Sequence, residues 1–69
     1  MFLRINTRRG EQIINTDHII RITPPKGTTK YTIWMDEIDY EEDGTMINYW
    51  ESVIEPSFEE LVEKLGGTI

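Results

Sequence analysis

The dipeptide Asp43-Gly44 constrains the fold of this chain most, because it separates two stretches whose side chains alternate as they do in strands. An Asp-Gly pair in this setting is the strongest short signal for a β-hairpin, since glycine adopts a positive φ without steric cost. The sequence therefore predicts a strand over Tyr31–Tyr40, a two-residue type I′ turn at Asp43-Gly44, and a partner strand over 46–54.

The predicted hairpin also carries a run of acids, with six carboxylates among the eight residues 36–43. Strand alternation separates its side chains onto two faces. One face is expected to hold the inward-facing residues Ile38, Tyr40, Ile47 and Tyr49. The other is expected to hold Glu37, Asp39, Glu41, Met46, Asn48 and Trp50. The same register sets Asp36 against Glu51, and opposed like charges are unfavourable, so we predict a bulge near residues 35–37 or 50–52.

Two interpretations of the acidic face stay open. Neighbouring carboxylates on one face of a strand lie about 6.6 Å apart. Their repulsion in water is therefore only about 0.6 kcal/mol per pair. A solvated face that blocks edge pairing explains the acids. A binding surface that combines them with Met46 and Trp50 is the alternative.

The rest of the chain predicts more strands and one helix. Short strands are expected over 2–6, 12–15 and 19–23, separated by a turn at 8–11, a break at Thr16-Asp17 and the Pro24-Pro25 pair. Ser57 and Glu60 form a capping box, and the residues that follow carry one apolar stripe: Phe58, Leu61, Val62 and Leu65. We predict a single α+β (mainly β) domain over 1–69. Its fold is an antiparallel sheet of about five twisted strands, or an SH3-like partial barrel, with one C-terminal helix.

Charge is distributed unevenly along the chain. Residues 1–30 hold six bases and two acids, a net charge of +4, whereas residues 31–69 hold eleven acids and one base, a net charge of −10. The total of −6 argues against general nucleic-acid binding and against an anionic membrane surface. It favours a protein partner with a basic surface, or pairing of the two halves within the molecule.

Composition limits the chemistry that the chain can perform. There is no cysteine and only one histidine, His18, which is expected at a surface or turn. Neither a thiolate site nor a histidine cluster can form, and no phosphate loop or nucleophile motif is present. The spacing Asp39-x-Glu41-x-Asp43-Gly44 matches the first half of an EF-hand loop, but Trp50 occupies the twelfth position, so only adventitious Ca²⁺ binding is expected. We predict no enzyme activity, no metal site and no cofactor.

Length and hydropathy give three weaker expectations. A chain of 69 residues is marginally stable alone, so a dimer or larger homo-oligomer is expected. No apolar run approaches the roughly 20 residues of a membrane span. The first residues lack the pattern of a signal peptide, so a cytoplasmic location is expected.

Several short segments together resemble a known family. They are Gly10-Glu11, Asn15-x-Asp17-x-Ile19 and the helix Ser57-Phe58-Glu59-Glu60-Leu61-Val62-Glu63-Lys64. Covering about half of the chain, they are similar to the small FlbD-type flagellar proteins, and this resemblance implies a non-enzymatic accessory fold. The segment Thr7–Glu11 also resembles the start of the carbon storage regulator family of RNA-binding proteins.

Three functional hypotheses follow. The leading one is a regulatory or protein–protein interaction module with a partner-binding surface at Glu37, Asp39, Glu41, Asp43, Met46 and Trp50. The second is an acidic inhibitor of phage type that imitates nucleic acid through the same carboxylates. The third is an RNA- or DNA-binding module that uses a basic face of Arg4, Arg8, Arg9 and Arg21.

Overall fold

Five antiparallel strands and one C-terminal helix make up residues 1–66, which are the part of the chain described by this computed structural model. The elements in chain order are β1 (Phe2–Thr7), β2 (Gly10–Asn15), the 3₁₀ turn η1 (Thr16–His18), β3 (Ile19–Thr23), β4 (Tyr31–Tyr40), β5 (Met46–Val53) and α1 (Phe58–Lys64). The predicted strand ranges and the predicted helix are confirmed, and the break at Thr16-Asp17 is the turn η1.

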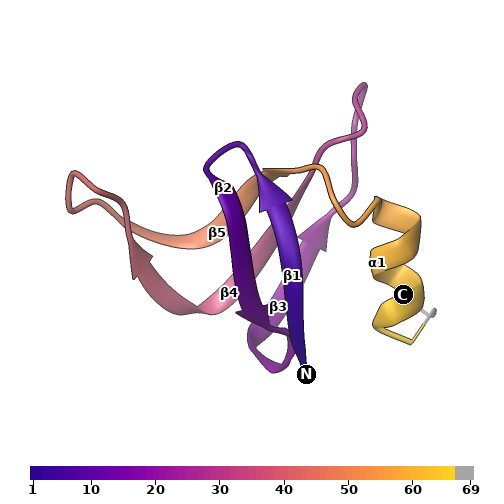
Figure 1. The fold of residues 1–69 in the computed structure, drawn as a ribbon, viewed down its shortest axis with the longest axis horizontal. Coiled ribbons are helices and arrows are strands. Elements are labelled where there is room, and N and C mark those ends of the chain that lie inside the picture. The colour runs from indigo at the N-terminus through magenta and orange to yellow at the C-terminus, as the bar shows by residue number, and fades with distance from the viewer. Residues whose placement is uncertain (67–69) are drawn as a thin grey trace.

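The strands divide between two sheets. The hairpin β1–β2 is one sheet, and β3, β4 and β5 form the other in that order (Figure 1). A single isolated bridge joins them: Asn6 N–H donates to Glu55 O, and Ile54 N–H donates to Asn6 O, both at 2.8 Å. No closed barrel forms within residues 1–66. The mainly β class with five antiparallel strands is confirmed.

The core lies between the sheets and beneath the helix. It is formed by side chains from four strands and α1, namely Leu3, Ile5, Ile14, Tyr31, Ile33, Met35, Val53 and Leu61. Alternation explains the contribution of β1, in which Leu3 and Ile5 point inward while Phe2 and Arg4 point outward. The helix contributes Leu61, which is fully buried, and Phe58 packs edge-on against Tyr31 with ring centroids 5.7 Å apart.

Helix α1 begins and ends as the sequence predicts. Ser57 is the N-cap: its hydroxyl accepts a hydrogen bond from Glu60 N–H at 3.3 Å and donates to the Glu60 carboxylate at 3.2 Å. Gly66 follows the C-cap residue Leu65 with φ of +109°, which is the left-handed conformation that commonly ends a helix. Residues 1–66 contain no helix that is long and apolar enough to cross a membrane.

The β4–β5 turn differs from the prediction by one residue. Glu41 N–H donates to Thr45 O and Gly44 N–H donates to Glu41 O, both at 2.9 Å, so the loop has three residues, with Gly44 at φ +88°. This is a type I turn followed by a left-handed glycine, whose strand pairing is offset from that of a two-residue turn. Tyr40 therefore pairs with Met46 rather than with Ile47.

The offset turns the side chains of β4 over relative to those of β5, because a shift of one residue in register moves a strand's side chains to the opposite face. Ile38 and Tyr40, expected inside, are 62% and 64% exposed. Trp50, expected on the outer acidic face, instead packs partly against the core. Only Ile47 keeps its predicted inward position, at 6% exposure.

The predicted bulge is confirmed, and both of the proposed places are irregular. In β4, Trp34 pairs with Tyr49 and Asp39 with Ile47, so β4 uses three more residues than β5 between these pairs. In β5, the extra residue lies between Trp50 and Val53, where Ser52 has φ of +59°. Asp36 and Glu51 therefore do not face each other.

Replacing Ser52 by glycine is expected to raise the free energy of unfolding by about 0.5–1 kcal/mol. The left-handed conformation costs an L-residue about 1–2 kcal/mol, and the greater freedom of unfolded glycine offsets part of the gain. Chemical denaturation of Ser52→Gly, with Ser52→Val as the strained control, tests this. Equal destabilisation by both substitutions would contradict it.

The environment of Tyr31 predicts that the folded protein loses stability at alkaline pH. Its hydroxyl donates to Pro56 O at 2.6 Å, and burial, with a smaller contribution from Glu60, raises the pKa of Tyr31 to about 12. The unfolded chain loses this proton near pH 10, so the stabilisation is complete below pH 10 and is lost as pH rises through 12. Tyr31→Phe is expected to cost about 1 kcal/mol at pH 7. Unfolding curves should show the stability difference between the wild type and this variant shrinking from pH 10 to 12; a constant difference refutes the assignment.

Candidate functional site

A groove runs between β2 and the β4–β5 hairpin. Its first part, of about 500 Å³, is bounded by residues 12–15 on one side and by residues 35–39 and 47–50 on the other. Its second part, of about 560 Å³, continues to the β4–β5 turn. Both parts share Gln12, Asp39, Ile47 and Trp50, so they are continuous. We call the whole depression the acidic groove.

Carboxylates dominate the lining of the acidic groove. Its acids are Glu37, Asp39, Glu41, Glu42 and Asp43, and the single base among its described lining residues is Arg9. The register explains this placement: Asp39 pairs with Ile47, and directly paired residues share a face, so the carboxylate lies on the same side as the buried isoleucine. The three-residue turn therefore directs the acids toward β2.

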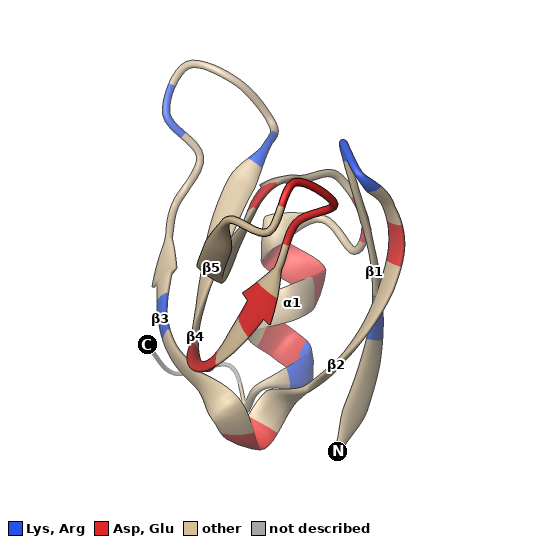
Figure 2. Ribbon diagram, turned by 90° about the vertical axis from the view of Figure 1, so that its left-hand side faces the viewer, with Lys and Arg blue, Asp and Glu red and all other residues tan. Residues whose placement is uncertain are grey.

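Ion pairs join the basic first half of the chain to the acidic second half. At the hairpin tips Arg9 contacts Glu41, and Arg8 contacts Glu51. The Arg9–Glu41 pair is partly enclosed, with side chains 24% and 31% exposed. Figure 2 shows the basic tip of β1–β2 and the acidic turn of β4–β5 at the same end of the molecule.

The remaining predicted basic residues are also engaged. Arg4 lies 3.6 Å from Glu11 across β1–β2. The Arg21 guanidinium lies 4.6 Å from the centre of the Trp34 ring, which in turn packs against Tyr49 at 5.1 Å. Of the four arginines grouped from the sequence, three lie on the β1–β2 hairpin and Arg21 lies on β3 of the second sheet, so they do not form one patch.

Three carboxylates of the groove, those of Asp39, Glu42 and Asp43, form no ion pair within residues 1–66. Asp43 accepts a hydrogen bond from Thr45 N–H at 2.9 Å, and this contact with Thr45 holds the pKa of Asp43 below its ordinary value. The Asp39 carboxylate accepts from Tyr40 N–H at 2.8 Å. The hydrogen bond to Asp43 favours its charged form, so the turn end of the groove carries negative charge.

The predicted apolar members of the binding surface separate from one another. Met46 is 64% exposed and pairs with the equally exposed Tyr40 on the side of the hairpin opposite to Asp39. Trp50 lines the acidic groove and is half-buried. The acids, Trp50 and part of Tyr40 thus line the groove, whereas Met46 lies outside its lining.

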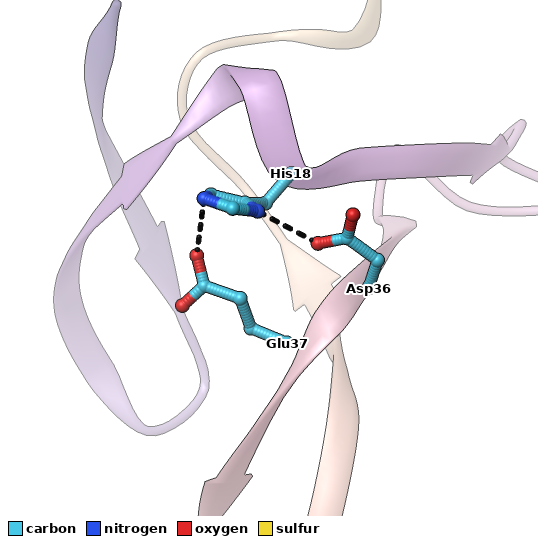
Figure 3. Close-up of side chains that lie close together, drawn as sticks. All are labelled: His18, Asp36 and Glu37. Atoms are coloured by element: carbon cyan, nitrogen blue, oxygen red, sulfur yellow. Dashed lines mark hydrogen bonds and ion pairs between the residues drawn. The ribbon is translucent and has the colours of Figure 1, made fainter.

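His18 forms a contact that sequence reasoning missed. Its Nδ1 lies 2.8 Å from Asp36 and its Nε2 lies 3.0 Å from Glu37, as Figure 3 shows. Adjacent residues of a regular strand point to opposite faces, so it is the bulge in β4 that lets both carboxylates reach one imidazole. The pairing of Ile19 with Met35 brings the three residues together, and only the strand register, not the spacing along the chain, foreshadows this contact.

Within residues 1–66, this cluster is the one whose side chains could hold a metal ion, since one ligand atom from each of the three residues lies within 4.8 Å of the others. The two ring nitrogens, however, face different carboxylates on opposite sides of the ring. The imidazole therefore lies between the two carboxylates, and the three side chains do not converge on a single point where an ion would bind. As arranged, the cluster ties η1 to β4 and forms two ion pairs when the ring is protonated.

Comparison with protein-family models, with curated proteins and with solved structures finds no match to this chain. The resemblance to FlbD-type flagellar proteins accordingly stays a prediction from short segments. Function has to be argued from the acidic groove itself.

The Arg9–Glu41 pair is expected to couple the two hairpins by about 1 kcal/mol, at the upper end for such pairs because it is partly enclosed. A double-mutant cycle with Arg9→Gln and Glu41→Gln, followed by chemical denaturation, measures this coupling. The exposed Arg4–Glu11 pair is the matched control and is expected to show almost none. Additive effects of Arg9→Gln and Glu41→Gln would show that the contact does not join the hairpins.

Proposed function

We propose that this protein is a small non-enzymatic interaction module that binds the basic surface of a partner protein in its acidic groove. The observation that carries the proposal is the charge of that groove. Five carboxylates and one arginine line it, and three of the carboxylates form no ion pair within residues 1–66. Arg8 and Arg9 already form ion pairs with Glu51 and Glu41, so these three acids are left available for a partner.

Such a surface suits recognition by charge and shape. Complementary charge speeds association and excludes wrong partners, while buried apolar and aromatic groups supply most of the affinity. Trp50 within the groove and Ile38 at its side provide apolar surface next to the acids. A lysine- or arginine-bearing surface is the complement of both features.

The environment of the acids supports a binding role over catalysis. A carboxylate that acts as a general acid or base needs a desolvated setting that brings its pKa toward neutrality. Asp39 and Asp43 are exposed, and the pKa of Asp43 is shifted downward. These properties favour permanent negative charge.

The inhibitor that imitates nucleic acid is the second candidate, and it uses the same groove. Its partner is a protein whose own nucleic-acid site is lined with Lys and Arg, and its affinity falls steeply with ionic strength. No contact of residues 1–66 favours the third candidate, because Arg4, Arg8 and Arg9 each contact a carboxylate and Arg21 covers Trp34.

Neutralising the unpaired acids of the groove is expected to abolish capture of the partner. The test variant carries Asp39→Asn, Glu42→Gln and Asp43→Asn, which remove three charges without breaking an ion pair. The control variant removes three charges elsewhere, with Glu55→Gln, Glu59→Gln and Glu63→Gln. Quantitative pull-down at low and high salt should show about tenfold less partner for the test variant and an unchanged amount for the control. Equal recovery by all three proteins would mean that the acids only solvate the surface.

A further inference from the structure

The edge of β2 that faces the acidic groove carries main-chain groups without a strand partner in residues 1–66, since β2 pairs with β1 alone. Thr16 N–H donates to Met1 O at 2.8 Å, which makes residues 1 and 16 a hydrogen-bonded pair. Hydrogen-bonded and non-hydrogen-bonded pairs alternate along an antiparallel pair of strands. The N–H and C=O groups of Ile13 and the N–H of Asn15 therefore point away from β1, whereas the C=O of Asn15 accepts the first hydrogen bond of η1.

These main-chain groups lie beside both acidic and apolar side chains of the groove. Residues 12–15 line its first part, so the unpaired edge borders the depression directly. Across the groove lie Glu37 and Asp39, and none of the described residues that line this part is a base. Ile13 and Ile38, which are 63% and 62% exposed, offer apolar surface beside the acids.

We propose that the groove accepts an extended segment of a partner protein, which adds as a strand to β2 and carries alternating basic and apolar side chains. The inference rests on the proposed function and specifies how the partner binds. In strand addition, main-chain hydrogen bonds supply affinity and alternate side chains supply specificity. Here the main-chain groups of Ile13 and Asn15 would form the hydrogen bonds that supply affinity. The carboxylates and the exposed isoleucines would supply specificity.

The negative charge of the groove favours a basic strand over a second copy of the chain as the partner of the β2 edge. Each copy has a net charge of −6, and pairing two β2 edges brings the carboxylates of both grooves together. A basic strand meets these acids with opposite charge instead. An exposed strand edge without such a partner is a site of unwanted association, which gives the acids a protective role in the unbound protein.

A defined peptide tests the inference. The probe is acetyl-Lys-Val-Lys-Val-Lys-Val-Lys-amide, and binding is followed through the amide signals of the full chain by NMR. Saturable shifts are expected along residues 12–15. A peptide of the same charge with an N-methyl group on every residue cannot donate those hydrogen bonds in either strand direction and is expected to bind about tenfold more weakly. A peptide with glutamate in place of lysine is expected not to bind.

The matching variant of the chain is Ile13→Pro. Proline removes the N–H that faces the groove and leaves the pairing with β1 intact, because the amide of residue 13 does not bond to β1. This variant is expected to lose about tenfold in peptide affinity while the signals of the core residues stay in place. If the variant does not fold, the N-methylated peptide still decides the question with the natural chain.

Three results would overturn the inference, and they differ in whether the proposed function fails with it. If the N-methylated peptide binds as well as its parent, with shifts confined to residues 39–43, strand addition is wrong and the proposed function survives. If the Asp39→Asn, Glu42→Gln, Asp43→Asn variant binds the parent peptide unchanged, the proposed function fails as well. If sedimentation shows a dimer that Ile13→Pro dissociates, the occupant of the edge is a second copy.

Discussion

The left-handed backbone of Gly44 is the constraint on which the distinctive part of this molecule depends. A turn of three residues pairs Tyr40 with Met46, and this register turns Asp39 toward the same side as the buried Ile47. One residue fewer in the turn would send the carboxylates outward and bring Tyr40 inside. The charge of the groove, the contact of Glu41 with Arg9 and the exposed Tyr40–Met46 pair are all consequences of that single backbone choice.

The opposite charges of the two halves of the chain are used in two ways. Part of the acidic surplus pairs with the arginines at the tip of β1–β2, where Arg8 and Arg9 contact Glu51 and Glu41. Other acids form no ion pair within residues 1–66, and Asp39, Glu42 and Asp43 among them lie at the β4–β5 turn. Intramolecular pairing therefore accounts for only part of the acidic surplus, because the arginines are too few and too widely spread to reach every carboxylate.

Local patterns predict the elements of this fold well, and they fail where the outcome depends on one residue of register. The capping box at Ser57 and the alternation of β1 are local, and the structure follows both. Asp43-Gly44 suits either a two-residue or a three-residue turn, so the faces of the hairpin could not be read from it. The bulge was predicted from an opposition of Asp36 and Glu51 that belongs to the two-residue turn; in the register of the three-residue turn an unbroken ladder would set Asp36 against Trp50 instead. The bridge through His18 was not, because it requires the register of β3 on β4.

The joint between the sheets contains few main-chain hydrogen bonds. Within residues 1–66, the two sheets share such bonds only at the Asn6 bridge. Side-chain contacts span the gap at three further places: Arg9–Glu41, Arg8–Glu51, and His18 with Glu37 beside η1. The β1–β2 hairpin is thus held to the second sheet mainly by side chains, which are the apolar residues that it contributes to the core and the charged residues at its tip. Dissolved ions screen exposed ion pairs and leave apolar packing in place. Added salt is therefore expected to weaken only the electrostatic part of this attachment.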